Sequence, residues 1–189
     1  MSFFPSYLNL KDKKILLIGG GYIALEKLEK LVDFTTEIKV IAKEVSDDFL
    51  EFAKKYNIKI EKRAYIKGDI KDFNIVIVAT DTKELHKEIY QESRSSRVLV
   101  NSVDNTKYCD FIFPSYIKQG DLTISISTSG ASPAMAKRIR IYIEKLIPSN
   151  IGEFLKEMKS LRKSMPKGKK RMKFFEEKSD EFMKKYLNF

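Results

Sequence analysis

Three glycines follow an apolar run in the segment KKILLIGGGYIALEKLEKL, residues 13–31, where they could hold a phosphate group. Gly19, Gly21 and Ala24 fit the pattern G-x-G-x-x-A, which binds a dinucleotide when it lies between a strand and a helix. The first glycine permits the turn, the second lets a pyrophosphate approach the amides at the helix N-terminus, and the small third residue lets helix and strand pack closely. We therefore predict a phosphate-binding turn; the alternative is a tight turn without a ligand.

The motif IAKE, which ends the second apolar strand, should face the adenosine half of such a cofactor. A carboxylate there would bond the ribose hydroxyls of NAD and repel the additional phosphate of NADP. Here Ala42 and Lys43 stand at the strand end, and Glu44 follows one step later. The residues alone favour NAD only weakly, because Glu44 is equally suited to supply negative charge at the start of the next helix.

Two polar motifs follow later strands. ATDT lies just beyond the fourth strand, where ligands of open sheets bind, so we expect Thr80 and Asp81 to contact the cofactor; alternatively, Asp81 caps the next helix. VNSVD places Asn101 and Asp104 at the same edge, Asn101 as a candidate substrate contact. A partly buried aspartate beside a cofactor can act as a general base, whereas the alternative for both residues is ordinary turn formation.

The motif STSGASPAMAKRIR, residues 127–140, predicts a second anion site. Ser132 is placed as an N-cap and Pro133 at the first helical position, and the small residues before them leave amides pointing outward. A carboxylate-bearing ligand would suit these amides together with Thr128, Lys137, Arg138 and Arg140. The opposite face of the helix is an apolar stripe that predicts a core or dimer contact, formed by Met135, Ile139, Tyr142, Ile143 and Leu146.

These residues need a sheet whose strands end at one edge. Apolar runs without polar alternation predict strands covered on both faces, and helical patterns lie between them. The alternation predicts an α/β fold with a Rossmann-like, doubly wound parallel sheet. We expect strands at 15–18, 37–41, 58–63, 74–79 and 97–100, and helices after Gly21 and at 45–56 and 83–93.

The character of the sequence changes after residue 113. Residues 121–127, DLTISIS, alternate strictly and predict a strand with one exposed face; a helix follows from Pro133, and then a polar helical tail. We expect an NAD-binding domain at 1–113, a dimerisation segment at 114–148 and a short, basic helical domain at 149–189.

Composition narrows the function classes. With 189 residues and 43% apolar content the chain can bury a full core. No window of eighteen apolar residues and no signal-like N-terminus are present, so we expect a soluble, cytoplasmic protein with no membrane partner. Cys109 and His86 are the only residues of their types, which predicts no internal disulfide and no zinc site within the chain.

Several segments, in order over residues 3 to about 148, resemble the precorrin-2 dehydrogenase family, the dehydrogenase and chelatase part of sirohaem synthesis. The resemblance is carried by FFPSYLNLKDKKILLIGGGYIALEK, ATD, VNSVD, CDFIFPS and DLTISISTSGASPAMAKRIR. It implies that precorrin-2 loses a hydride to NAD and a proton to the medium or a base, giving sirohydrochlorin, and that some members also insert Fe(II). The key aspartate of the family corresponds to Asp104.

The same resemblance implies cofactor contacts at Gly21, Tyr22, Ile23, Lys43 and Glu44. It places Thr128 near the substrate cleft. The alternating strand at 121–127 and the apolar stripe of the following helix predict a homodimer joined through the 114–148 segment, because one small domain cannot cover these surfaces alone. The alternatives left open are a sirohydrochlorin ferrochelatase as the main activity and a dinucleotide-sensing binding protein.

The charge agrees with a polyanionic substrate. The formal net charge is +10, and residues 149–189 hold 12 Lys and Arg against 6 Asp and Glu. A tetrapyrrole rimmed with carboxylates would be attracted to such a surface. A nucleic acid is the less favoured partner of the motif KGKKRMKFF, since acidic residues are interspersed through the tail.

Overall fold

The computed structural model describes residues 3–186 and divides them into two compact units, one from Phe3 to Ile112 and one from Phe113 onward. The expected end of the NAD-binding domain at residue 113 lies beside this division. The outermost residues of the expected first and last domains, 1–2 and 187–189, lie outside the described residues.

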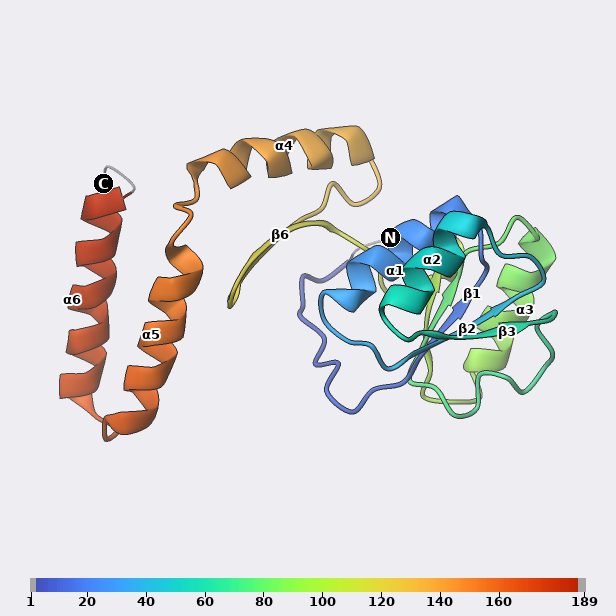
Figure 1. Cartoon of the computed structure of the whole chain (residues 1–189), viewed down its shortest axis with the longest axis horizontal. Helices are drawn as coiled ribbons and strands as arrows, with labels where there is room; N and C mark the ends of the chain where they lie inside the picture. The colour runs from blue at the N-terminus through green and yellow to red at the C-terminus, as the bar shows by residue number, and fades with distance from the viewer. Residues whose placement is uncertain (1–2, 187–189) are drawn as a thin grey trace. The chain divides into compact units, whose positions relative to one another are not determined.

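A five-stranded parallel sheet forms the first unit and confirms the predicted doubly wound fold (Figure 1). The strands lie in the order β3-β2-β1-β4-β5. Their bounds are β1 Ile15–Ile18, β2 Ile38–Ala42, β3 Lys59–Lys62, β4 Ile75–Val78 and β5 Leu99–Ser102, and the helices are α1 Tyr22–Val32, α2 Asp47–Lys55 and α3 Lys83–Ser93.

Both faces of this sheet are covered, which explains why its central strands lack polar alternation. Figure 1 shows α1 and α2 on one face and α3 on the other. All four residues of β1 and all four of β4 are buried. On the α3 face Leu16, Val76 and Val100 pack with Ile89 of α3. Since the five strands are parallel, the glycine turn and the loops after β2, β4 and β5 all emerge at one edge.

The fifth strand begins two residues later than predicted. Its pairing with β4 runs from Ile75↔Leu99 to Val78↔Ser102, so it includes Asn101 and Ser102, which the sequence analysis placed beyond the strand. These two polar residues are 5% and 2% exposed. The Asn101 side chain is satisfied by the Phe111 carbonyl, whereas the buried Ser102 hydroxyl has no hydrogen-bond partner among the described residues.

The second unit contains an antiparallel hairpin and three helices. The strand predicted at 121–127 is confirmed as β7 Leu122–Ile126, and it pairs with β6 Ser115–Gln119, which was not predicted. The helices are α4 Pro133–Leu146, α5 Ile151–Ser164 and α6 Lys169–Tyr186, and α5 and α6 lie side by side (Figure 1). The rings of Phe154 and Phe182 stack between them with centroids 4.3 Å apart.

Two contacts join the hairpin to α5. A Cβ built on Gly120, at the hairpin turn, would lie 2.9 Å from the Cα of Gly152, so the two backbones meet directly. The Lys159 ammonium group lies 2.9 Å from the Asp121 carboxylate beside this contact. The helical tail is therefore anchored to the hairpin by backbone packing and one ion pair.

Replacing Gly19 with Ala should destabilise the first unit severely. Gly19 has a φ of +125°, and a Cβ there would lie 2.1 Å from the carbonyl oxygen of Ala79. Gly68→Ala is the matched control, because Gly68 has a φ of +107° but no atom within 3.8 Å of its Cβ position. In urea unfolding we expect a loss of about 1–3 kcal/mol for Gly68→Ala, from backbone strain alone, and more than about 4 kcal/mol for Gly19→Ala. Equal losses would contradict the steric argument.

Candidate functional site

The glycine turn after β1 packs tightly against the protein on one side and is open to solvent on the other. The ideal Cβ position of Gly19 lies 3.6 Å from the Cβ of fully buried Ala24, so both small residues of the motif sit where space is tightest. Gly21 has no atom within 4 Å of its Cβ position. The turn is thus packed toward the protein and clear where a pyrophosphate would lie.

The N-terminus of α1 faces this clear side with backbone amides that have no partner within the helix. Gly21 is the N-cap and makes no side-chain capping bond, and the first turn holds no acidic residue. The helical ladder begins with the Leu25 amide, which donates to the Gly21 carbonyl at 3.0 Å. The amides before it add to the positive end of the helix dipole, the combination that binds phosphate groups.

Gly20 is a site-forming residue that the sequence analysis missed. A Cβ there would lie 2.5 Å from the carbonyl oxygen of Glu44, and the Gly20 carbonyl accepts a 2.9 Å hydrogen bond from the Ser46 amide. The turn therefore rests directly on the loop after β2. The sequence feature that could have identified Gly20 is the run of three glycines, because the G-x-G pattern does not require a glycine at its middle position.

The predicted cofactor contacts border this edge of the sheet. Tyr22 is 72% exposed and Ile23 39% exposed at the start of α1. Lys43 and Glu44 are exposed after β2, and Asp81 is exposed after β4. These side chains are accessible to a ligand at the edge where the strands end.

Asp104 lies in a left-handed turn directly after β5. Its φ is +60°, an uncommon conformation for a residue other than glycine, and its side chain is exposed. The partly buried environment expected for a general base is therefore absent in the chain alone. Burial and the charge of Lys30 lower the pKa of half-buried Lys27 on α1, while the Asp104 carboxylate acts in the opposite direction, so Asp104 and Lys27 interact electrostatically.

The Cys109 thiol fastens the turn that carries Asp104. The Ser102 amide donates to Sγ at 3.2 Å, and Sγ donates to the Ser102 carbonyl at 3.1 Å, closing the segment between these two residues. Burial raises the pKa of this thiol, which keeps it protonated as a donor. The cysteine is thus a structural clamp within the site.

The structure argues against Asn101 as a substrate contact. The residue is 5% exposed, and its Nδ2 donates a 2.8 Å hydrogen bond to the carbonyl of Phe111. Because the predicted strand was placed two residues too early, this amide was assigned to the crevice. It instead holds the segment after the Asp104 turn against β5.

The residues predicted to bind a carboxylate lie in the second unit, around the N-terminus of α4. The Ser132 amide donates to Thr128 Oγ1 at 3.1 Å, and Ser132 caps the helix by accepting from the Met135 amide at 3.2 Å. Arg138 is exposed, whereas Arg140 forms an ion pair of 2.5 Å with Glu144. Thr128 and Ser132 therefore shape the loop, and Arg138 is the more accessible cation.

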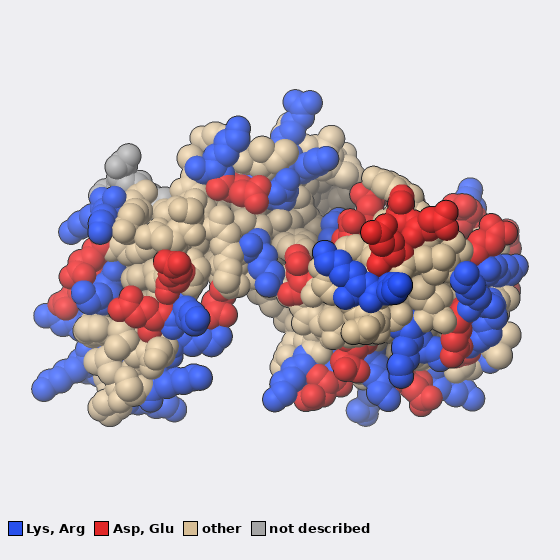
Figure 2. Space-filling view, in the orientation of Figure 1, with Lys and Arg blue, Asp and Glu red and all other residues tan. Residues whose placement is uncertain are grey.

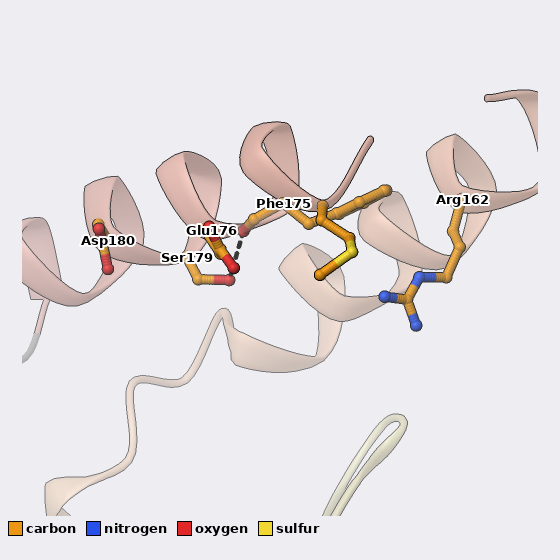
Figure 3. Close-up of a pocket in the computed structure, with 6 residues that line it drawn as sticks. Arg162, Phe175, Glu176, Ser179 and Asp180 are labelled. Carbon is orange, nitrogen blue, oxygen red and sulfur yellow. Dashed lines mark hydrogen bonds between the residues drawn. The ribbon is translucent and has the colours of Figure 1, made fainter. Parts of the chain in front are cut away.

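A pocket of about 550 Å³ lies on the α5–α6 pair, and none of the predicted site residues lines it (Figure 3). Arg162 stands at one end with its guanidinium carbon 5.2 Å from the Phe175 ring centroid, and the acidic Glu176 and Asp180 lie along α6. The Ser179 hydroxyl donates to the Phe175 carbonyl at 2.8 Å. Its mixed charges and internal bonds do not match a polyanionic ligand.

Within residues 3–186, no group of three or more His, Cys, Asp or Glu side chains is arranged to hold a metal ion. In the same part of the chain, every helix is too short or too polar to span a bilayer.

Two family profiles match the chain. Residues 6–115 match the family described as "Putative NAD(P)-binding", which covers the sheet and its crevice edge. Residues 119–146 match the family described as "Sirohaem biosynthesis protein central", which covers β7 and α4.

Individual relatives agree with these profiles. The siroheme synthase of Nitrosococcus oceani is 33% identical over 94% of this chain and 39% of its own length, and that of Methylococcus capsulatus is 32% identical over 93% and 38%. The chain thus spans about two fifths of the length of these curated relatives. The solved structure of SirC, a precorrin-2 dehydrogenase, superimposes with a TM-score of 0.76 at 26% identity, covering 89% of this chain and 85% of SirC.

Replacing Gly21 with Val should abolish nicotinamide-cofactor binding without unfolding the protein. The φ of −90° and ψ of −170° suit a β-branched residue, and the space around the Cβ is clear, so the fold should tolerate the change. The branched side chain would then occupy the space of the pyrophosphate. Calorimetric titration should show at least a hundredfold weaker binding, with an unchanged melting temperature in the absence of cofactor. Wild-type affinity in a folded variant would show that the turn is only structural.

Proposed function

The chain belongs to the family described as "Putative NAD(P)-binding", and we propose that it oxidises precorrin-2 to sirohydrochlorin with NAD as the hydride acceptor. The observation that carries the proposal is the shared edge: the clear glycine turn after β1 and the Asp104 turn after β5 both emerge where parallel strands end. This edge is where open α/β sheets bind their ligands.

The reaction divides between cofactor and protein. When bound, NAD accepts the hydride that leaves a carbon of precorrin-2 with the bonding electron pair. The amides at the start of α1 hold the pyrophosphate, and the Asp104 carboxylate takes the proton that the macrocycle must also lose. One hydride and one proton leave the substrate, so the product has lost two hydrogens and no other group is consumed.

NAD is proposed over NADP because of the loop after β2. Glu44 lies there with its carboxylate exposed, and its backbone packs against Gly20 of the phosphate-binding turn. A carboxylate in this place accepts hydrogen bonds from ribose hydroxyls and repels a 2′-phosphate. Lys43 beside it reduces that repulsion, so the preference should be moderate rather than absolute.

The distribution of charge supports a polyanionic substrate. Residues 158–175 hold eight Lys and Arg and no Asp or Glu, and in the structure they form the end of the helix pair where α5 connects to α6. Figure 2 shows basic side chains around this end. Acids that seemed interspersed in the sequence therefore lie away from a strongly cationic surface, which would attract a carboxylate-rimmed tetrapyrrole.

The two aromatic residues of the same region are poorly placed to stack on nucleic-acid bases. Single-stranded nucleic acid is bound by exposed aromatic rings. Phe174 and Phe175 are only partly exposed, and the Phe175 ring is covered by the Arg162 guanidinium. The substrate contacts proposed are Arg138 and Thr128 at the start of α4, with Arg140 held in its ion pair.

Asp104→Asn should lower the rate of precorrin-2 oxidation by about a hundredfold or more while the affinity for NAD changes little, because the amide keeps the shape but cannot accept the proton. Asp12→Asn is the matched control, since Asp12 is also exposed and left-handed, with a φ of 59° against 60°. The assay follows the absorbance of purified protein incubated with precorrin-2 and NAD. A wild-type rate for Asp104→Asn would show that the proton leaves to water.

The same assay separates the alternative activities. Fe(II) added after the oxidation tests metal insertion, which we propose uses Asp104 to help remove the pyrrole protons and should fall in Asp104→Asn. A chelatase without the redox step would insert Fe(II) into supplied sirohydrochlorin and leave precorrin-2 unchanged. Cofactor binding with neither reaction would identify a dinucleotide-sensing protein.

We also propose that two copies associate through α4. Its stripe is exposed in the single chain, with Met135 51%, Ile139 38%, Tyr142 66% and Leu146 54% accessible. A contiguous apolar helix face of this kind marks an interface. Sedimentation should show a homodimer at micromolar concentration, converted to a monomer by Tyr142→Glu but not by Lys137→Glu on the opposite face of the helix. A wild-type monomer would remove this proposal.

A further inference from the structure

His86 is buried but incompletely paired. It is the only histidine of the chain, lies in the first turn of α3 and is 4% exposed. Its Nε2 lies 2.8 Å from the carbonyl oxygen of Thr80, and because a carbonyl only accepts, Nε2 carries the proton. Among the residues that the structure describes, the other ring nitrogen, Nδ1, has no hydrogen-bond partner.

This arrangement is unfavourable for stability alone. A buried polar atom without a partner costs about 1–3 kcal/mol, and one hydrogen bond to a carbonyl returns only about 1 kcal/mol. An apolar side chain of similar size would fill the same space without that penalty. Buried groups that break this rule are expected where function requires them.

The single bond falls on the loop that flanks the glycine turn. Ala79 donates from its amide to Ile18 at 2.8 Å, and its carbonyl is the atom against which Gly19 packs. Thr80 comes next, and its own hydroxyl is buried with no partner among the described residues. Thr82, the N-cap of α3, makes no side-chain capping bond. The side-chain hydrogen bond that joins the loop to α3 is therefore the one between the His86 imidazole and the Thr80 carbonyl.

We propose that His86 is a positioning residue for the nicotinamide cofactor, acting through the Thr80 carbonyl on the loop of residues 79–82. It does not touch the cofactor. It holds the peptide of Thr80 so that the loop keeps one conformation against the glycine turn before the cofactor arrives, which lowers the cost of ordering on binding. The inference rests on the proposed function only in that the crevice binds NAD.

The test compares cofactor affinity in folded variants. His86→Leu keeps an apolar volume and removes the donor, so the dissociation constant for NAD should rise about tenfold, equivalent to about 1.4 kcal/mol. His86→Gln places an amide nitrogen near the position of Nε2 and should restore affinity to within about threefold of wild type. His86→Asn, with a shorter amide that stops near the position of Nδ1, should behave like His86→Leu and serves if the apolar variant does not fold.

Ser93→Ala is the matched control. Ser93 is 1% exposed at the other end of α3, and its hydroxyl donates to the Tyr90 carbonyl at 2.8 Å and accepts from the Arg94 side chain at 2.9 Å. The variant therefore also loses a buried hydrogen bond to a carbonyl on this helix, together with the contact to Arg94. It should lower the melting temperature and leave the dissociation constant for NAD unchanged. Titrations are run below the lowest melting temperature of the set.

The possible results separate this inference from the proposed function. Wild-type affinity in folded His86→Leu or His86→Asn would overturn the positioning role. Failure of His86→Gln to restore affinity, or an equal loss in Ser93→Ala, would show that the effect is general destabilisation. If the wild-type protein itself binds no NAD, the proposed function fails before any variant is compared.

Discussion

The contact between Gly19 and the carbonyl of Ala79 is the constraint on which the rest of the crevice depends. It brings the end of β1 within van der Waals distance of the end of β4 and leaves no room for a side chain. Gly20 makes a comparable contact with the loop after β2. Because both inner sides of the turn are fixed by backbone, the third glycine is free to present an open surface, and α1 can begin with its amides facing a ligand.

Much of this unit could be predicted from the sequence because its strands are buried on both faces. Apolar runs such as residues 15–18 and 75–78 have no other stable location than the middle of a covered sheet. The bounds of β5 could not be obtained in the same way. Its last residues are polar. Asn101 pairs with Ile77 of β4, and its buried side-chain amide is satisfied by the Phe111 carbonyl ten positions later. A local pattern contains no information about such a partner.

The hairpin illustrates the same limit in the second unit. The strict alternation of β7 was visible, whereas β6 carries Tyr116, Lys118 and Gln119 among its five residues and shows no comparable pattern. Its strand conformation follows from pairing with β7, in which Ile117, the one buried residue of β6, faces Ile124. The acid-free run of residues 158–175 is visible in the sequence, whereas its place at the connection between α5 and α6 follows from the packing of these two helices.

The exposure of Asp104 changes how its chemistry must be understood. A carboxylate in water is well solvated, and the chain itself does not remove that water, since the residue is exposed in a turn fixed by the Cys109 thiol. What the protein supplies is position: the thiol clamp holds the turn, and Lys27 adds an opposing charge from α1. In the proposed reaction, water would have to be displaced by the two reactants themselves, the tetrapyrrole and the nicotinamide ring. Asp104 would therefore become an effective base only when both reactants are bound. The affinity for the cofactor alone should then not depend on Asp104. The site is ordered in advance by backbone contacts that exist before either reactant binds.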